Sequence, residues 1–122
     1  SHKTIRKTID LAKKLPLDFA VFQVATPLPG TKLWEMAKNN EGIQLLSEDY
    51  NKIKFNGTEP IVRLQHLTQE DLIKYYKRAY KEFYYRPSFI IRKLLKSPSD
   101  IIRFVKMGID LNKMIYRKGS YK

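Results

Sequence analysis

The sequence predicts a predominantly α-helical chain that begins with a single α/β step. Apolar residues recur at three- and four-residue steps over residues 4–15 and again after residue 68, which is the spacing of amphipathic helices. Between these regions, residues 18–26 form a nearly continuous run of apolar, β-branched and aromatic side chains. Such a run is typical of a strand buried on both faces of a parallel sheet. A helix, a short loop and a buried strand make up one step of an α/β architecture.

The first predicted element is a helix over residues 4–15. Ile5, Ile9 and Leu15 fall on one face of it, and charged residues occupy the other. Pro16 is expected to end this helix. The buried strand is then expected over residues 19–26.

A tight, rigid turn is predicted over residues 27–31, which contain two prolines and a glycine. Thr31 is expected to cap a helix over residues 32–39, and Gly42 closes that segment. From residue 43 to residue 60 the pattern weakens. Residues 61–64 are expected to form a short extended piece.

The second half of the chain predicts three helices. Thr68 with Asp71 resembles a capping box that starts a helix running to Tyr85. The Arg86-Pro87 pair ends it, and a short helix is expected over residues 88–96.

Residues 97–100 (SPSD) are a strong start signal for the last helix, with a serine cap, a proline at the first position and an acid at the third. This helix is expected to run to about Lys118. Its inner side is expected to carry Ile101, Ile102, Val105, Ile109 and Ile115.

Composition excludes several kinds of site. The 122 residues include no cysteine, so this polypeptide has no disulfide, zinc-thiolate site, cysteine nucleophile or cysteine-ligated iron–sulfur cluster. Its two histidines lie far apart without an acidic cluster beside them, so no metal site is expected. No apolar run approaches the roughly 20 residues of a membrane-spanning helix. With no signal-peptide pattern either, a cytoplasmic location is expected.

Basic residues concentrate in the second half. Residues 1–66 carry ten basic and seven acidic residues, a net charge of +3, whereas residues 67–122 carry fourteen and five, a net charge of +9. A positive field of this kind attracts nucleic acid, anionic lipid or an acidic partner domain, although a solvated lysine-rich surface without a partner explains it equally well.

Three ordered motifs resemble one protein family. They are TIRKTIDLAKKL at residues 4–15, TPLPGT at residues 26–31 and FYYRP at residues 83–87. Together they are similar to the C-terminal half of radical S-adenosylmethionine proteins of the cobalamin-binding type. That group includes Fe-S oxidoreductases, oxidative cyclases and methyltransferases. The position of Leu28 is often tyrosine in the family, so the match of the loop is incomplete.

The resemblance implies an α/β remnant of a partial (β/α) barrel, followed by a mainly helical C-terminal region. Residues 1–60 would be the end of the barrel, with residues 19–26 as its sixth strand, and residues 61–122 would be a basic helical region. Active sites of such barrels lie at the C-terminal ends of the strands. The resemblance therefore places Thr26, Pro27, Gly30 and Thr31 near the S-adenosylmethionine and substrate pocket. The alternative is a turn that only joins a strand to a helix.

The aromatic motif at residues 83–87 also has two interpretations. It could line a substrate channel or stack on a flat ligand. Alternatively, it is the end of a helix packed on the barrel, and this structural interpretation is favoured.

The cofactor-binding parts of that family lie outside this sequence. The Cys-x-x-x-Cys-x-x-Cys motif for a [4Fe-4S] cluster and the cobalamin domain are both absent, and no residue of this chain is identified as catalytic or metal-binding. The [4Fe-4S] cluster, S-adenosylmethionine and, where it is used, cobalamin are expected in a full-length parent. The expected partners are the upstream barrel and cobalamin-type domain of that parent, and a homodimer caused by truncation.

The resulting hypothesis is a fragment of a radical S-adenosylmethionine enzyme, an Fe-S oxidoreductase or methyltransferase, that is inactive alone. A different hypothesis is a basic helical module that binds nucleic acid or an anionic membrane surface. Basic residues of the last helix motivate it, although such binding is expected to be weak and non-specific.

Overall fold

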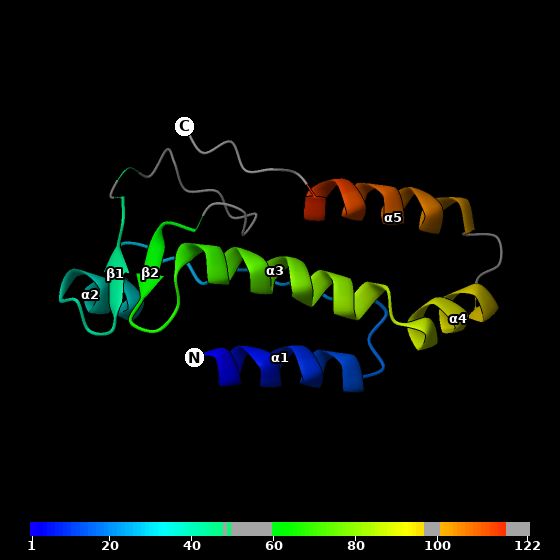
Figure 1. The fold of residues 1–122 in the computed structure, drawn as a ribbon, viewed down its shortest axis with the longest axis horizontal. Coiled ribbons are helices and arrows are strands. Elements are labelled where there is room, and N and C mark those ends of the chain that lie inside the picture. Colours follow the sequence, from blue (N-terminus) through cyan, green and yellow to red (C-terminus); the bar gives the residue numbers. More distant parts are fainter. Residues whose placement is uncertain (48, 50–59, 97–100, 117–122) are drawn as a thin grey trace.

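The computed structural model describes residues 1–47, 49, 60–96 and 101–116 (Figure 1). In this part of the chain the elements are α1 (His2–Lys14), α2 (Lys32–Lys38), β1 (Ile43–Leu45), β2 (Val62–Leu64), α3 (Gln69–Tyr84), α4 (Pro87–Lys96) and α5 (Ile101–Tyr116). The predicted fold class, predominantly α with a small β part, is confirmed.

Helix α3 is the centre of the molecule. It contacts α1, α4 and α5, and the small sheet with α2 lies beyond its N-terminal end (Figure 1). The predicted capping box starts it: the Thr68 side chain accepts a hydrogen bond from the Asp71 amide, and the Asp71 carboxylate accepts one from the Thr68 amide. Two donors that a helix start would leave unpaired are thereby satisfied.

The sheet consists of two antiparallel strands. Ile43 pairs with Leu64, and Leu45 pairs with Val62. Ile43 and Val62 are buried whereas Gln44 is exposed, so one face of the sheet lies on the core. Strand β2 agrees with the extended piece predicted at residues 61–64, but β1 was not predicted from the weak pattern after residue 43.

Two hydrophobic clusters form the core. One joins the sheet and α2 to the start of α3, and its buried members include Ala37, Val62 and Leu72. The other centres on Phe83 and Phe89, which are 0% and 1% exposed. The structural interpretation of the aromatic motif therefore agrees with the packing.

Residues 19–26 are not a strand of a sheet, contrary to the sequence prediction. They are extended, but no strand lies beside them in the described part of the chain. A strand of a sheet requires a second strand to complete its hydrogen bonds. Here tyrosine hydroxyls of α3 bond this backbone instead, as described below.

The predicted inner side of the last helix is wrong at three positions. Ile102, Val105 and Ile109 are 82%, 58% and 51% exposed. Helix α5 turns its Gly108 side toward α3, where the Tyr85 hydroxyl donates a hydrogen bond to the Gly108 carbonyl oxygen at 3.5 Å. Periodicity could not distinguish the two sides because both are apolar in sequence. The predicted cap at residues 97–100 and the end near residue 118 lie outside the described residues, and so does the burial of Ile101 and Ile115.

Contacts cross the domain boundary predicted at residue 60. Strand β1 pairs with β2, and α1 packs on α3. None of the described helices has the length and apolar character needed to cross a membrane.

Candidate functional site

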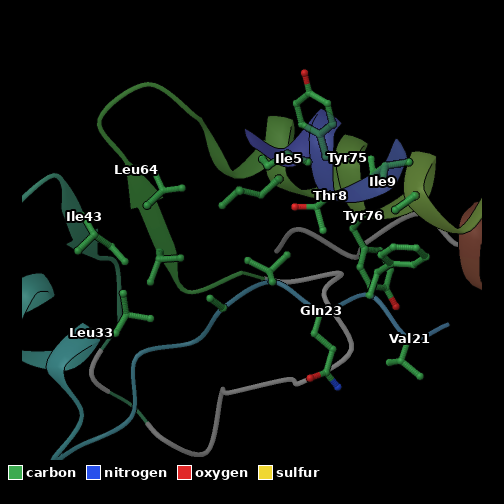
Figure 2. A pocket seen from close by; sticks show the side chains of 16 residues that line it. Ile5, Thr8, Ile9, Val21, Gln23, Leu33, Ile43, Leu64, Tyr75 and Tyr76 are labelled. Atoms are coloured by element: carbon green, nitrogen blue, oxygen red, sulfur yellow. The ribbon is translucent and has the colours of Figure 1, made fainter. Parts of the chain in front are cut away.

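A groove of about 450 Å³ opens between α1, residues 21–25, the small sheet and α3 (Figure 2). Most of its lining is aliphatic or aromatic. Ile5 and Ile9 come from α1, Ile43 and Leu64 from the sheet, and Tyr76 from α3. A space lined in this way suits apolar atoms and offers few polar groups for orienting a ligand.

Two tyrosine hydroxyls hold residues 19–26 along one wall of this groove. The Tyr84 hydroxyl accepts a hydrogen bond from the Ala20 amide at 3.1 Å and donates one to the Ala20 carbonyl oxygen at 2.9 Å. The Tyr80 hydroxyl does the same with Phe22, at 3.2 Å for both bonds. Each phenol thus satisfies both backbone groups of one residue, as a neighbouring strand would.

Helical and extended spacings explain why the two tyrosines match alternate residues. Four residues of a helix rise about 6 Å, and two residues of an extended chain span about 6.6 Å. The rings of Tyr80 and Tyr84 are stacked, with centroids 6.1 Å apart. The next ring along the helix is that of Tyr76, 5.1 Å from Tyr80. Burial, followed by its interaction with Tyr80, raises the pKa of Tyr76 to about 12, so its hydroxyl stays protonated.

The opposite side of residues 19–26 is open. Ala20, Phe22 and Val24 are half-buried, whereas Phe19 and Val21 are 64% and 57% exposed. Figure 2 shows the side chains of Val21 and Gln23 pointing away from α1 and α3. Side chains that alternate in this way are the pattern of a strand with one covered face and one uncovered face.

The four predicted site residues form the loop that follows this segment. The Thr31 amide donates to the Leu28 carbonyl oxygen at 3.1 Å, and Gly30 has a φ of +79°. Residues 28–31 therefore form a type II turn, with Pro29 second and Gly30, at positive φ, third. This turn type favours glycine at the third position. The predicted turn is confirmed.

Each predicted site residue also has a role within the fold. Pro27 is fully buried, and the Thr26 hydroxyl donates to the Val24 carbonyl oxygen at 3.3 Å. The Thr31 hydroxyl donates to the Leu28 carbonyl oxygen at 2.6 Å and accepts from the Trp34 amide at 3.2 Å, capping α2. None of Thr26, Pro27, Gly30 and Thr31 lines the groove. Their predicted place near S-adenosylmethionine stays a prediction.

A cluster of charges that the sequence did not reveal lies between α1 and α3. The Glu82 carboxylate, 20% exposed, contacts Arg6 at 2.6 Å and Lys13 at 2.8 Å, both across the helix interface. Arg78, one turn earlier on α3, contacts it at 2.6 Å. The four-residue spacing of Arg78 and Glu82 is a local signal that could have indicated that one pair, whereas no local pattern links Glu82 to α1.

The cations set the ionisation of Glu82. Burial alone raises the pKa of this carboxyl group, but hydrogen bonds from Lys13, Arg78 and Arg6 outweigh burial and lower the pKa to about 2. The group is therefore ionised at neutral pH, and it joins the helices without acting as an acid.

The donor set of this chain does not fit an iron–sulfur cluster, because the sequence contains no cysteine. Among the described residues, no group of three histidine, aspartate or glutamate side chains could hold a metal ion. The site consists of an apolar groove, a proline-rich turn and an open extended segment.

Comparison with known proteins shows a similarity to a longer protein. The chain is 36% identical over 109 residues to an uncharacterised methyltransferase of Pyrococcus horikoshii. The match covers 89% of this chain but 23% of the relative, so the chain is similar to one segment of a much longer protein. No family model and no solved structure matches.

Proposed function

We propose that this chain is part of a larger cytoplasmic radical S-adenosylmethionine methyltransferase, in which residues 1–60 complete a partial (β/α) barrel and residues 61–122 form a helical cover. The observation that carries this proposal is the extended segment at residues 19–26. One side is bonded to α3, and the other side is open and exposes the apolar side chains of Phe19 and Val21. The similarity to a longer methyltransferase-named protein supports the choice of reaction class.

The alternating exposure of this segment agrees with a barrel strand. In a (β/α) barrel each strand turns one face to the outer helices and the other to the barrel interior. Here Ala20 and Phe22 pack against α3, and Val21 and Gln23 would face the interior. A strand from the rest of the protein would pair with the free edge of the segment.

The proline-rich turn comes next in this arrangement. Thr26 and Pro27 end the segment, and Gly30 and Thr31 redirect the chain into α2. Because active sites of such barrels lie at the C-terminal ends of the strands, this turn would border the S-adenosylmethionine and substrate pocket. Its contribution would be shape and rigidity, since its threonine hydroxyls are engaged within the loop.

Cofactors of this proposed enzyme would be bound elsewhere in the longer protein. A reduced [4Fe-4S] cluster and S-adenosylmethionine supply the radical chemistry, and cobalamin, where it is used, carries a methyl group. The residues of this chain position the barrel wall and cover it, and none of them is assigned a catalytic role.

Two measurements test the proposal. The coding sequence upstream of Ser1 is expected to encode Cys-x-x-x-Cys-x-x-Cys. The longer protein, reconstituted anaerobically with iron and sulfide, is expected to show a cluster absorption band and to cleave S-adenosylmethionine. Replacement of the motif cysteines by alanine is the control and should abolish both. An upstream sequence without that motif, or a 122-residue chain that forms a stoichiometric cluster by itself, would contradict the proposal.

A further inference from the structure

Helix α4 turns two of its three charged residues, Arg92 and Lys93, inward and its aliphatic residues outward. Phe89 is buried on the inner side, where Arg92 donates to the Leu17 carbonyl oxygen at 2.6 Å and Lys93 contacts Asp18 at 2.9 Å. The aliphatic residues of the helix are 38–79% exposed; they are Ile90, Ile91, Leu94 and Leu95. An ordinary surface helix has the reverse arrangement.

Helix α5 repeats this outward apolar face. Ile102, Val105, Ile109 and Tyr116 are each more than half exposed. At 100° per residue they fall within one sector of the helix, which begins next to the Gly108 position that contacts Tyr85. Val105, Ile109 and Tyr116 also border a groove of about 470 Å³ against α3.

Basic residues adjoin the apolar sector of α5. Arg103, Lys106 and Lys113 are exposed, and Asp110 is the one acid in the sequence of this helix. Helix α4 contains no acid. Exposed aliphatic side chains beside a row of basic residues are the pattern of a helix that lies in the interface of an anionic membrane.

We infer that α4 and α5 form a membrane-docking surface that binds the interface of a bilayer containing anionic phospholipid. The aliphatic side chains of α4 and α5 would enter the boundary between headgroups and acyl chains, and Arg103, Lys106 and Lys113 would contact the phosphates. A nucleic acid would attract the same charges but would leave the aliphatic side chains in water. This inference is independent of the proposed enzymatic function.

Vesicle sedimentation tests the inference with the 122-residue chain. Vesicles of equal parts phosphatidylglycerol and phosphatidylcholine are expected to bind the chain at least tenfold more tightly than vesicles of phosphatidylcholine alone. A tenfold difference is about the contribution of one or two basic residues. Added salt should weaken the binding to the anionic vesicles without abolishing it, because the aliphatic contribution is insensitive to screening. Equal affinity for both vesicles, or no sedimentation with either, would overturn the inference.

Paired variants separate lipid docking from general stickiness. The double variant Leu95→Gln/Ile102→Gln is expected to lose roughly tenfold in anionic-vesicle affinity. It should fold normally, since these side chains are 79% and 82% exposed, and circular dichroism checks this. Leu11→Gln, at a 58% exposed position on α1, is the matched control and should bind like the unaltered chain. An equal loss of vesicle affinity in the control and the double variant would overturn the inference. So would tighter binding to duplex DNA than to anionic vesicles, if the double variant kept that DNA binding.

Discussion

At the scale of single residues, Glu82 and two tyrosines connect parts of the chain that are far apart in sequence. Glu82 joins α3 to Arg6 and Lys13 of α1. Tyr80 and Tyr84 join α3 to residues 20 and 22. These polar contacts fix where α1 and the extended segment lie on the central helix, whereas hydrophobic packing alone is non-directional.

Replacing Glu82 by glutamine (Glu82→Gln) is expected to lower the free energy of unfolding at neutral pH by about 1–2 kcal/mol, because three cations lose their shared carboxylate. The folded pKa of about 2 lies below the ordinary value of 4.5. The stabilisation from the charged group is therefore complete above about pH 4.5 and is lost as the pH falls toward 2. Urea denaturation at neutral pH and at about pH 3 measures it.

The control for this prediction is Glu70→Gln, an exposed acid in the first turn of the same helix. Its cost is expected to stay below about 0.5 kcal/mol. If the difference in the free energy of unfolding between Glu82→Gln and the unaltered chain were as large at about pH 3 as at neutral pH, the assigned ionisation would be contradicted.

Removing a single hydroxyl tests the support of the extended segment. Tyr84→Phe leaves the amide and carbonyl of Ala20 without this partner and is expected to cost about 1–3 kcal/mol. Amide exchange measured by NMR should accelerate at Ala20, and in Tyr80→Phe at Phe22. Tyr85→Phe, whose hydroxyl makes a longer bond of 3.5 Å at an exposed position, should leave both amides unchanged. Unchanged exchange in the first two variants would show that the hydroxyls do not hold the segment.

At the scale of elements, the turn at residues 28–31 separates the extended segment from α2. Its backbone conformation depends on Gly30, whose φ of +79° is one that other residues rarely adopt. Space is not limiting there, because a Cβ at this position would meet no atom within 4 Å. The requirement for glycine is therefore one of backbone conformation and not of packing.

Opposite results are expected from two glycine substitutions. Gly30→Ala should destabilise the chain by about 1 kcal/mol, since alanine is strained at a positive φ. Gly108→Ala should stabilise it by about 0.5–1 kcal/mol, because a glycine inside a helix loses more backbone entropy on folding than alanine. A Cβ at Gly108 also meets no atom within 4 Å. Thermal denaturation of both variants measures the two changes in stability. A lower stability of Gly108→Ala or a higher stability of Gly30→Ala would contradict this account.

At the scale of the whole molecule, the described structure leaves two apolar surfaces exposed. One is the outward side of residues 19–26, which includes Phe19 and Val21, and the other is formed by α4 and α5. Exposed apolar surface of this kind marks sites of association. The first is an extended edge suited to strand pairing, and the second is a helical surface beside basic residues.

The 122-residue chain is expected to associate through residues 19–26 in the absence of another strand. Light scattering should show an apparent mass that rises with concentration toward that of a dimer. Val21→Lys places a charge on the open side and should shift the association to higher concentration. Leu11→Lys, at a position with nearly the same exposure (58% against 57%), is the control and should behave like the unaltered chain. A monomer at all concentrations would contradict strand-mediated association.

Local signals in the sequence determined where most helices begin and end. The Thr68–Asp71 capping box, the Thr31 cap and the proline after α1 each act through backbone groups within four residues, so they can be recognised without knowing the fold. The type II turn at Gly30 is likewise a local preference. These elements were predicted correctly because their energetics are complete within a few residues.

Tertiary structure alone decided what those elements contact. Composition favoured a strand at residues 19–26, but a strand needs a neighbouring strand to complete its hydrogen bonds. Here the hydroxyls of Tyr80 and Tyr84 take that place, and they lie 58 and 64 positions away in the sequence. Ile102 and Val105 have the periodicity of a core face, yet they are 82% and 58% exposed, because the sequence of α5 is apolar on more than one side and does not say which side is covered. Glu82 meets Arg6 across 76 residues. Periodicity and composition report how apolar a segment is, but they carry no information about which distant residues fold against it.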